Sequence, residues 1–299
     1  MIRDFNQLLA RVKEGDNKRV VIAAAQSASA LEAAVMARKE NLADSILTGD
    51  KGYIVEFLKK EHPDYADAFE IVDTGQDLDL ACREAVNLIK KGKGHLILKG
   101  KASTAQLLKG VLDKENGLRT GSVMSDVLAY EHLDKLMLMS DGGINLYPEI
   151  KEMIAIINNA VKVAHALENE KPRVAVLAAV ESVNPKMPCT IDASLLAKMN
   201  DRGQISGCYV DGPLAFDNAV SEEAARTKGI ESEVAGKADI LIFPNIEAGN
   251  VFGKTLTYYC HYRVAHVVMG AKVPILIASR ADNAETKMLS MALGILAAT

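Results

Sequence analysis

A cluster of polar side chains follows the last apolar run of this 299-residue chain. Residues 273–278 predict a buried parallel strand. Directly after it come a hydroxyl, a guanidinium and two carboxylates, those of Ser279, Arg280, Asp282 and Glu285. In α/β sheets, ligands bind at the carboxyl ends of strands, where the N–H groups of the next helix point at anions. Because an arginine fork matches two oxygens of a phosphate or carboxylate at once, the junction predicts an anion site.

The two carboxylates of this junction also have a purely structural explanation. Asp282 and Glu285 have the spacing of a capping box, in which the first side chain caps the helix and the second reaches back to it. That explanation does not cover Ser279 and Arg280, which precede the cap.

Two further strand-to-helix junctions carry polar residues. Asp211 follows the predicted strand 205–210 and precedes a Gly-Pro turn, so it is either a ligand-facing carboxylate or a turn residue. Gly249, Asn250 and Lys254 follow the predicted strand 240–243. With Asn250 as the helix cap, this segment is either a phosphate cradle or an ordinary turn.

Composition and charge exclude several classes of protein. Hydrophobic residues make up 49% of the chain and charged residues 25%, which is typical of a globular protein. A net charge of −4 argues against a nucleic-acid partner. The absence of a signal peptide and of a long apolar run predicts a cytoplasmic protein with no membrane partner. The six histidines form no metal-binding motif, and no G-x-S-x-G serine-hydrolase motif occurs.

Short apolar runs alternate with amphipathic segments along the whole chain, which predicts an α/β fold with mainly parallel sheets. The predicted strands are residues 19–25, 45–48, 69–72, 95–99, 135–139, 173–179, 205–210, 240–243, 265–269 and 274–278. The predicted helices are residues 28–39, 78–90, 104–112, 149–167, 193–199, 222–228, 250–262 and 283–296. A polar, glycine-containing segment at residues 117–126 interrupts this alternation and places a domain boundary near residues 125–150.

The chain resembles the phosphate acetyl/butyryltransferase family, most of all its phosphate butyryltransferases. The resemblance rests on long, ordered blocks that cover most of the chain: residues 117–125, 140–145, 210–220, 228–230, 234–239, 244–250 and 270–285. It implies two α/β domains related to isocitrate and isopropylmalate dehydrogenases, with the active site in the interdomain cleft. We expect a first domain of residues 1–135 plus 270–299, a second of residues 136–269, and a homodimer or higher homo-oligomer.

The resemblance also implies a reaction, in which an acyl group passes reversibly between coenzyme A (CoA) and inorganic phosphate. We expect CoA as a substrate, no cofactor and no metal. Ser279 and Arg280 match the family's Ser-Arg pair, so Arg280 is expected to bind the phosphoryl group and Ser279 to stabilise the intermediate or the thiolate. The acetyltransferases carry a catalytic Asp where this chain has Thr286, so the adjacent Glu285 is the expected general base.

Further substrate contacts are expected from both halves of the chain. The candidate phosphate- and substrate-binding residues are Arg119, Ser125, Asp211, Gly249, Asn250 and Lys254. Residues 126–133 contain no arginine, unlike the corresponding segment of the acetyltransferases, which favours a butyryl or branched acyl group. A phosphate acetyltransferase, a dehydrogenase of related fold and a small-ligand-binding protein remain as alternatives.

Overall fold

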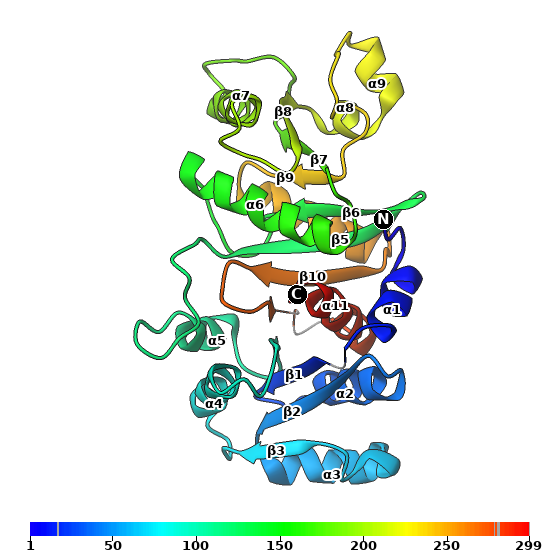
Figure 1. Cartoon of the computed structure of the whole chain (residues 1–299), viewed down its shortest axis with the longest axis vertical. Coiled ribbons are helices and arrows are strands. Elements are labelled where there is room, and N and C mark those ends of the chain that lie inside the picture. Colours follow the sequence, from blue (N-terminus) through cyan, green and yellow to red (C-terminus); the bar gives the residue numbers. More distant parts are fainter. Residues whose placement is uncertain (17, 278, 280–281, 299) are drawn as a thin grey trace. The chain divides into compact units, whose positions relative to one another are not determined.

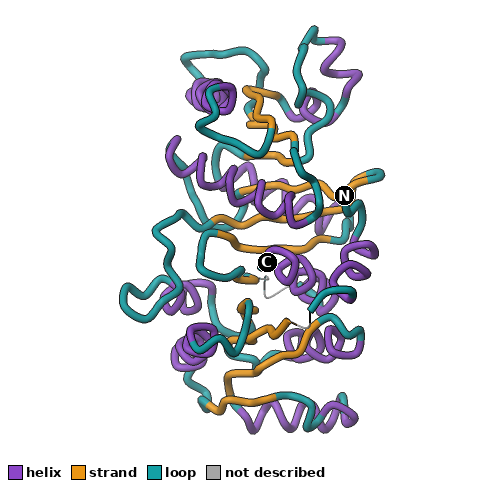
Figure 2. The backbone as a smooth tube through the Cα atoms, in the orientation of Figure 1, coloured by secondary structure: helices purple, strands orange, loops and turns teal. Residues whose placement is uncertain are grey.

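The computed structural model describes residues 1–16, 18–277, 279 and 282–298. The chain divides into two compact units. The first comprises Met1–Asp4 and Val123–Arg263, and the second comprises Phe5–Ser122 and Val264–Thr299. Both combine strands with helices, and Figure 2 shows the strands in orange between helices in purple. No described helix has the length and apolar character needed to cross a membrane.

The sheet of the second unit is mostly parallel. Its order is β3-β2-β1-β4-β11-β10, and only β10 and β11 run antiparallel. The strands are β1 (Lys18–Ala23), β2 (Ala43–Gly49), β3 (Glu70–Asp73), β4 (Leu96–Lys99), β10 (Val264–Met269) and β11 (Ile275–Leu276). The central strands are runs of buried aliphatic residues, as expected for strands that are covered on both faces.

Helices of the second unit cover both faces of its sheet (Figure 1). On one face α11 packs against α1 and α2, and on the other α4 packs against α5. The helices of the unit are α1 (Phe5–Lys13), α2 (Ala28–Lys39), α3 (Lys51–Glu61), α4 (Leu78–Lys90), α5 (Thr104–Val111) and α11 (Ala284–Ala297), with a short 3-10 turn, η1 (Pro63–Tyr65).

The sheet of the first unit has the order β5-β6-β9-β7-β8. β5 and β6 form an antiparallel hairpin, and the remaining neighbours are parallel. The strands are β5 (Ser125–His132), β6 (Lys135–Ser140), β7 (Arg173–Leu177), β8 (Tyr209–Leu214) and β9 (Ile240–Ile242). Because β5 runs antiparallel to β6, its first residues lie beside the carboxyl end of β6.

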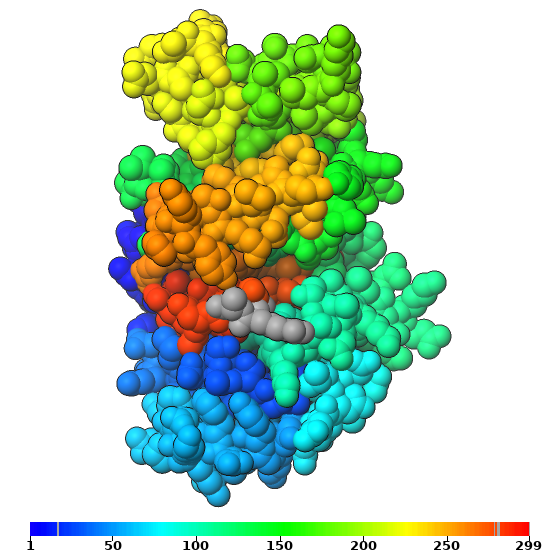
Figure 3. All heavy atoms as spheres, turned by 180° about the vertical axis from the view of Figure 1, so that it is seen from behind, coloured from blue at the N-terminus to red at the C-terminus, as the bar shows by residue number. Residues whose placement is uncertain are grey.

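Helices also lie on both faces of the sheet of the first unit. α6 faces the viewer in Figure 1, whereas the segment from α10 to η2, gold and orange, faces the viewer in Figure 3. The helices are α6 (Ile150–Ala166), α7 (Pro188–Asp201), α8 (Phe216–Val220), α9 (Glu222–Thr227) and α10 (Ile246–Lys254), and η2 (Thr255–Tyr259) is a π-helical extension of α10.

The predicted mixed α/β fold with mainly parallel strands is confirmed, and several predicted boundaries are wrong. Strand β8 runs through Asp211 and the Gly-Pro pair, because a register shift between Ala175 and Leu177 of β7 absorbs one extra residue. Helix α10 begins at Ile246, four residues before the predicted start, because Asn245 caps it. The sequence interpretation also omitted α1, α3, α8 and β5.

The predicted domains of residues 1–135 plus 270–299 and residues 136–269 remain a prediction. Contacts within the chain divide it after Asp4, after Ser122 and after Arg263. The hairpin of β5 and β6 therefore belongs entirely to the first unit, whereas the predicted boundary, between residues 135 and 136, falls just inside β6.

Candidate active site

In the first unit, the loop that follows β6 is built around the carboxylate of Asp141. Its Oδ1 accepts hydrogen bonds from Gly143 N (2.8 Å) and Ile144 N (3.1 Å). Its Oδ2 accepts from Asn145 N (3.2 Å) and Asn145 Nδ2 (2.5 Å). A second Asn145 bond, from Nδ2 to Met124 O (2.8 Å), joins the loop to the chain entering β5. The carboxyl end of β6 is thus a polar loop closed by hydrogen bonds to one carboxylate.

The carboxylate of Asp141 is buried and lies near a second acid. Burial, reinforced by the charge of Asp126, raises the pKa of Asp141 to about 6. The hydrogen bonds from Gly143 and Asn145 oppose this change, because they stabilise the charged form. Asp141 is therefore a carboxyl group that changes charge in the range where many active-site acids work.

Ser125, a predicted phosphate ligand, begins β5 beside this loop. Its side chain is fully buried, and its Oγ accepts a hydrogen bond from Asn159 Nδ2 (2.9 Å) on α6. The same amide donates to Val123 O (3.0 Å). In this arrangement Ser125 holds β5 to α6, and its predicted contact with phosphate remains a prediction.

The predicted residues of the third junction lie on α10, where two of them contact the Asp141 loop. A Cβ atom on Gly249 would lie 2.3 Å from Asp141 O, so only glycine allows this helix to pack so closely. Asn250 donates from Nδ2 to Gly142 O (2.8 Å). Because Asn245, not Asn250, caps the helix, Lys254 lies at the last residue of α10, where its ammonium lies 5.9 Å from the ring centre of Tyr258. The predicted position of these three residues at a helix start is wrong, whereas their predicted contact with phosphate remains a prediction.

Asp211 lies within β8, not at a strand end. Its Oδ1 accepts a hydrogen bond from the adjacent Gly212 N (2.8 Å), and the side chain is half-buried. Among the described residues, no hydrogen bond joins it to the Asp141 loop. Its predicted role in binding substrate is not tested by this geometry.

In the second unit, Ser279 and Asp282, which follow β11, are joined by two hydrogen bonds. Ser279 N donates to Asp282 Oδ2 (2.6 Å), and Asp282 N donates to Ser279 O (3.2 Å). Asn283 caps α11 through a bond from Thr286 N to its Oδ1 (2.8 Å). The predicted capping box of Asp282 and Glu285 is wrong, because Asp282 binds the strand-end amide and Asn283 takes the cap position.

The other predicted site residues of this unit that the structure describes are exposed. Ser279 and Glu285 are exposed, and Glu285 lies in the first turn of α11. Arg119 is exposed, pairs through its backbone with Ala271, and forms no ion pair among the described residues. Arg280 lies outside the residues that the structure describes.

Two buried lysines in this unit were missed by the sequence interpretation. Lys99, at the carboxyl end of β4, donates to Ala102 O (3.1 Å) and is 3% exposed. Lys287, in the first turn of α11, is also 3% exposed and donates to the backbone oxygens of Ser279 and Asp282. A signal was available for Lys287, because it is the only charged residue of the sequence between Thr286 and Thr299, a stretch that is mostly apolar.

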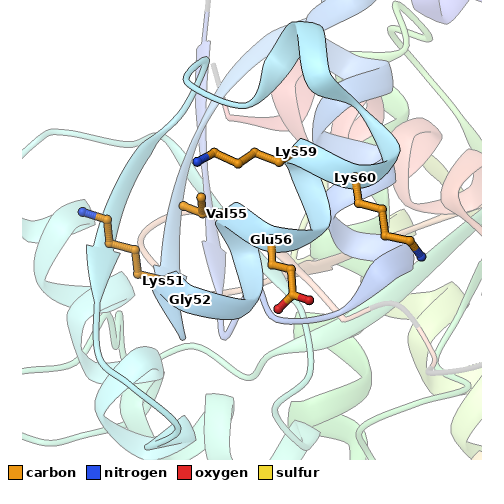
Figure 4. Close-up of a pocket in the computed structure, with 6 residues that line it drawn as sticks. All are labelled: Lys51, Gly52, Val55, Glu56, Lys59 and Lys60. Carbon is orange, nitrogen blue, oxygen red and sulfur yellow. The ribbon is translucent and has the colours of Figure 1, made fainter.

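The surface hollow on α3 lacks the features of an active site. Figure 4 shows its charged side chains spreading in different directions from one helix. It is lined by Lys51, Gly52, Val55, Glu56, Lys59 and Lys60. All of these except Val55 are exposed, so none of the charges is held in a fixed, desolvated position. Nowhere in the described part of the chain do three or more His, Cys, Asp or Glu side chains gather closely enough to bind a metal.

Comparison with known proteins shows which family the chain belongs to. Residues 76–295 match the phosphate acetyl/butaryl transferase family, and the chain belongs to that family. It is 50% identical to the phosphate butyryltransferase of Clostridium acetobutylicum over 300 aligned residues, covering 100% of this chain and 99% of the relative. It is 42% identical to the phosphate acetyltransferase of Thermotoga maritima, covering 97% of this chain and 98% of the relative.

A solved structure with a similar sequence and fold supports this family membership. The crystal structure of a branched-chain phosphotransacylase from Enterococcus faecalis matches with a TM-score of 0.83 at 31% sequence identity. The match covers 94% of this chain and 99% of that chain.

A pair of glycines on α10 tests the close packing of this helix against the Asp141 loop. Gly249→Ala places a methyl group against backbone atoms of Asp141, so we expect a loss of about 1–3 kcal/mol in the free energy of unfolding. Gly253→Ala, on the same helix, meets only Leu128 Cδ1 at 3.4 Å and Met139 Sδ at 3.7 Å. It should be neutral or stabilise by about 0.5–1 kcal/mol. Urea unfolding of both variants checks this, and equal effects would contradict the packing argument.

The raised pKa of Asp141 predicts a dependence of stability on pH. Between about pH 4 and 6 the folded protein holds this proton more strongly than the unfolded chain, so the contribution of Asp141 to stability is fully present at low pH and is lost as pH rises through 6. Part of the loss comes from repulsion by Asp126. We therefore expect Asp126→Asn to gain stability relative to wild type as pH rises from 4 to 7.

The matched control for this prediction is Asp134→Asn. Asp134 is an exposed acid at the opposite end of the hairpin of β5 and β6. The effect of Asp134→Asn on the free energy of unfolding should therefore not change with pH as Asp141 ionises. Unfolding measured at several pH values tests both variants, and a pH-independent effect of Asp126→Asn would show that Asp141 does not ionise in this range.

Proposed function

We propose that the protein is an enzyme that transfers a short acyl group reversibly between CoA and inorganic phosphate, with acyl phosphate and free CoA as products. The observation that carries this proposal is the 50% identity to a phosphate butyryltransferase along the whole chain. The relatives at 42% and 31% identity bear names of the same reaction class. A small-ligand-binding protein and a dehydrogenase are disfavoured by the same matches.

The chemistry requires three things of the protein. The CoA thiol must lose a proton when it attacks an acyl phosphate, and in the opposite direction the departing thiolate must take up a proton. The tetrahedral intermediate needs hydrogen-bond donors, and the phosphate needs a cation. We assign the phosphate to Arg280, the intermediate or thiolate to Ser279, and the proton to Glu285. Arg119, Ser125, Asp211, Gly249, Asn250 and Lys254 remain proposed substrate contacts.

The finer points of the resemblance are proposals as well. We favour a butyryl or branched acyl group over acetyl, because the relative with the higher identity is a butyryltransferase and the solved relative is named a branched-chain enzyme. We expect no cofactor besides CoA as substrate, and a cytoplasmic location. The relation to isocitrate dehydrogenase and the placement of the site between domains remain predictions.

We also propose that the enzyme is a homodimer or a higher homo-oligomer. The first unit exposes large apolar side chains along α10 and η2, the segment that faces the viewer in Figure 3. Val251 is 65% exposed, Tyr258 54% and Tyr259 84%. Exposed apolar groups this close together are typical of a surface that binds another protein.

The proposed reaction is tested by the release of CoA thiol from acyl-CoA. We expect release from butyryl-, isobutyryl- and isovaleryl-CoA that depends on added phosphate, with slower release from acetyl-CoA. Discrimination between neighbouring chain lengths should be modest, because one methylene is worth about 1–3 kcal/mol. Release without phosphate would point to a thioesterase, and no release with any substrate would reject the transferase.

The assignment of Glu285 as general base is tested by a pH–rate profile. Glu285→Gln should remove the acidic limb of the profile and lower kcat by about 10²–10⁴-fold. As a control, Glu84→Gln alters a carboxylate on α4 that accepts a hydrogen bond from Asn87 Nδ2, three residues along the same helix (3.2 Å). If Glu285→Gln keeps the wild-type profile and changes only thermal stability, Glu285 is a helix-start residue and the base lies elsewhere.

A further inference from the structure

One peptide group of the loop after β6 connects Asp141 to the proposed substrate contact Asn250. This group lies between Gly142 and Gly143, and it is trans. Its N–H donates to Asp141 Oδ1 (2.8 Å), and its C=O accepts from Asn250 Nδ2 (2.8 Å). Because the N–H and C=O of a trans peptide point in opposite directions, the Asp141 carboxylate and the Asn250 amide bind opposite sides of the same group.

The orientation of this peptide group depends on Asp141. Glycines stand on both sides of the group, so side chains hardly restrict rotation about the two bonds that flank it. Among the described residues, Asp141 is the one hydrogen-bond acceptor of Gly143 N. The carboxylate also accepts from the next two amides, those of Ile144 (3.1 Å) and Asn145 (3.2 Å). Without the carboxylate, the group can rotate and turn its carbonyl away from α10.

The orientation of the Asn250 side chain depends in turn on that carbonyl. Asn250 is exposed, and the bond to Gly142 O is the one hydrogen bond that its side chain makes to described residues. Because a carbonyl oxygen can only accept, the bond also fixes which side of the amide carries Nδ2. Its Oδ1 and its second N–H therefore point in set directions. The neighbouring Gly249 keeps the helix close to the loop, since a Cβ atom there would lie 2.3 Å from Asp141 O.

We propose that Asp141 is a positioning residue for acyl transfer, which orients the Asn250 amide through the peptide group between Gly142 and Gly143. The proposal rests on the proposed function, in which Asn250 contacts substrate. Asp141 is 3% exposed and its oxygens accept four hydrogen bonds, so it acts through Asn250 and does not contact substrate itself. An amide that is already oriented loses less side-chain entropy when it binds a substrate.

A double-mutant cycle on the full-length enzyme separates this role from general stabilisation. Asn250→Ala should lower kcat/KM for butyryl-CoA or for phosphate about tenfold, as expected for the loss of one hydrogen bond. Asp141→Ala should lower the same kcat/KM at least as much. Because both changes remove the same substrate contact, the double variant should match Asp141→Ala. A further tenfold loss in the double variant, or wild-type kinetics of Asn250→Ala, would overturn the proposal.

Asp141→Asn is the second variant, in case Asp141→Ala fails to fold. One oxygen of the new side chain can still accept from Gly143 N, but a neutral amide is a weaker acceptor than a carboxylate. We therefore expect faster hydrogen exchange of the Gly143 amide, and a kcat/KM between those of wild type and Asn250→Ala. Exchange of Gly143 at the wild-type rate, or faster exchange with wild-type kcat/KM, contradicts the positioning role.

Asp239→Asn is the matched control in the same unit. Asp239 is a buried acid, 7% exposed, that accepts from Arg173 N (2.9 Å) and pairs with Lys135 (2.9 Å) where β7 and β9 begin. It makes no hydrogen bond to the Asp141 loop among the described residues. This variant should unfold at a lower temperature, while kcat/KM and the exchange of Gly143 stay at wild-type values. Equal kinetic losses in Asp239→Asn and Asp141→Asn would show that Asp141 acts only through stability.

The outcomes distinguish this inference from the proposed function. An inactive wild type rejects acyl transfer. In that case hydrogen exchange of the Gly143 amide and of the Asn250 side-chain amide decides whether Asp141 orients Asn250. Faster exchange of both in Asp141→Ala supports the orientation, and unchanged exchange overturns it. With an active wild type, the double-mutant cycle decides.

Discussion

The constraint on which this structure depends is the need to satisfy backbone polar groups where parallel strands end inside a protein. A strand that enters a turn leaves N–H and C=O groups that water cannot fully reach. This chain meets the need with charged side chains that are themselves buried. In the first unit the carboxylate of Asp141 accepts four hydrogen bonds from the loop after β6. In the second unit the ammonium of Lys287 donates to the carbonyl oxygens of Asp282 and Ser279.

These buried charges have consequences for chemistry. Removal from water raises the pKa of Asp141 to about 6 and lowers that of Lys287. Asp141 also holds the loop beside Ser125, and Lys287 binds the backbone of Ser279; the family resemblance assigns both serines to substrate. A fixed turn is valuable for acyl transfer, because the reaction gains most of its rate from orientation and from donors aimed at a developing charge.

The sequence was sufficient for the fold class and for the family, because both depend on long patterns. Apolar runs of the correct length identified most strands, and α2 and α4 have the predicted limits. Features that depend on tertiary contacts were harder to predict. The cap of α11 is Asn283, not Asp282, because the Asp282 carboxylate finds the Ser279 amide, and the glycine at position 249 faces the chain's own loop.

Within the candidate site, residue types were easier to predict than their partners. Ser279 and Glu285 could be named from their position after a strand and from the family motif. Lys287 and Asp141 could not be assigned a role, because a lysine in a helix or an acid before two glycines is usually exposed. Their burial depends on how α11 packs on its neighbours and on how α10 packs against the Asp141 loop.

The most direct test of the account is phosphorus NMR of the purified protein with butyryl-CoA and inorganic phosphate. We expect the phosphate resonance to decline while an acyl phosphate resonance appears, with one free thiol formed for each acyl phosphate. Added CoA should reverse the change. Thiol release with an unchanged phosphate resonance and free butyrate as product would contradict acyl transfer to phosphate.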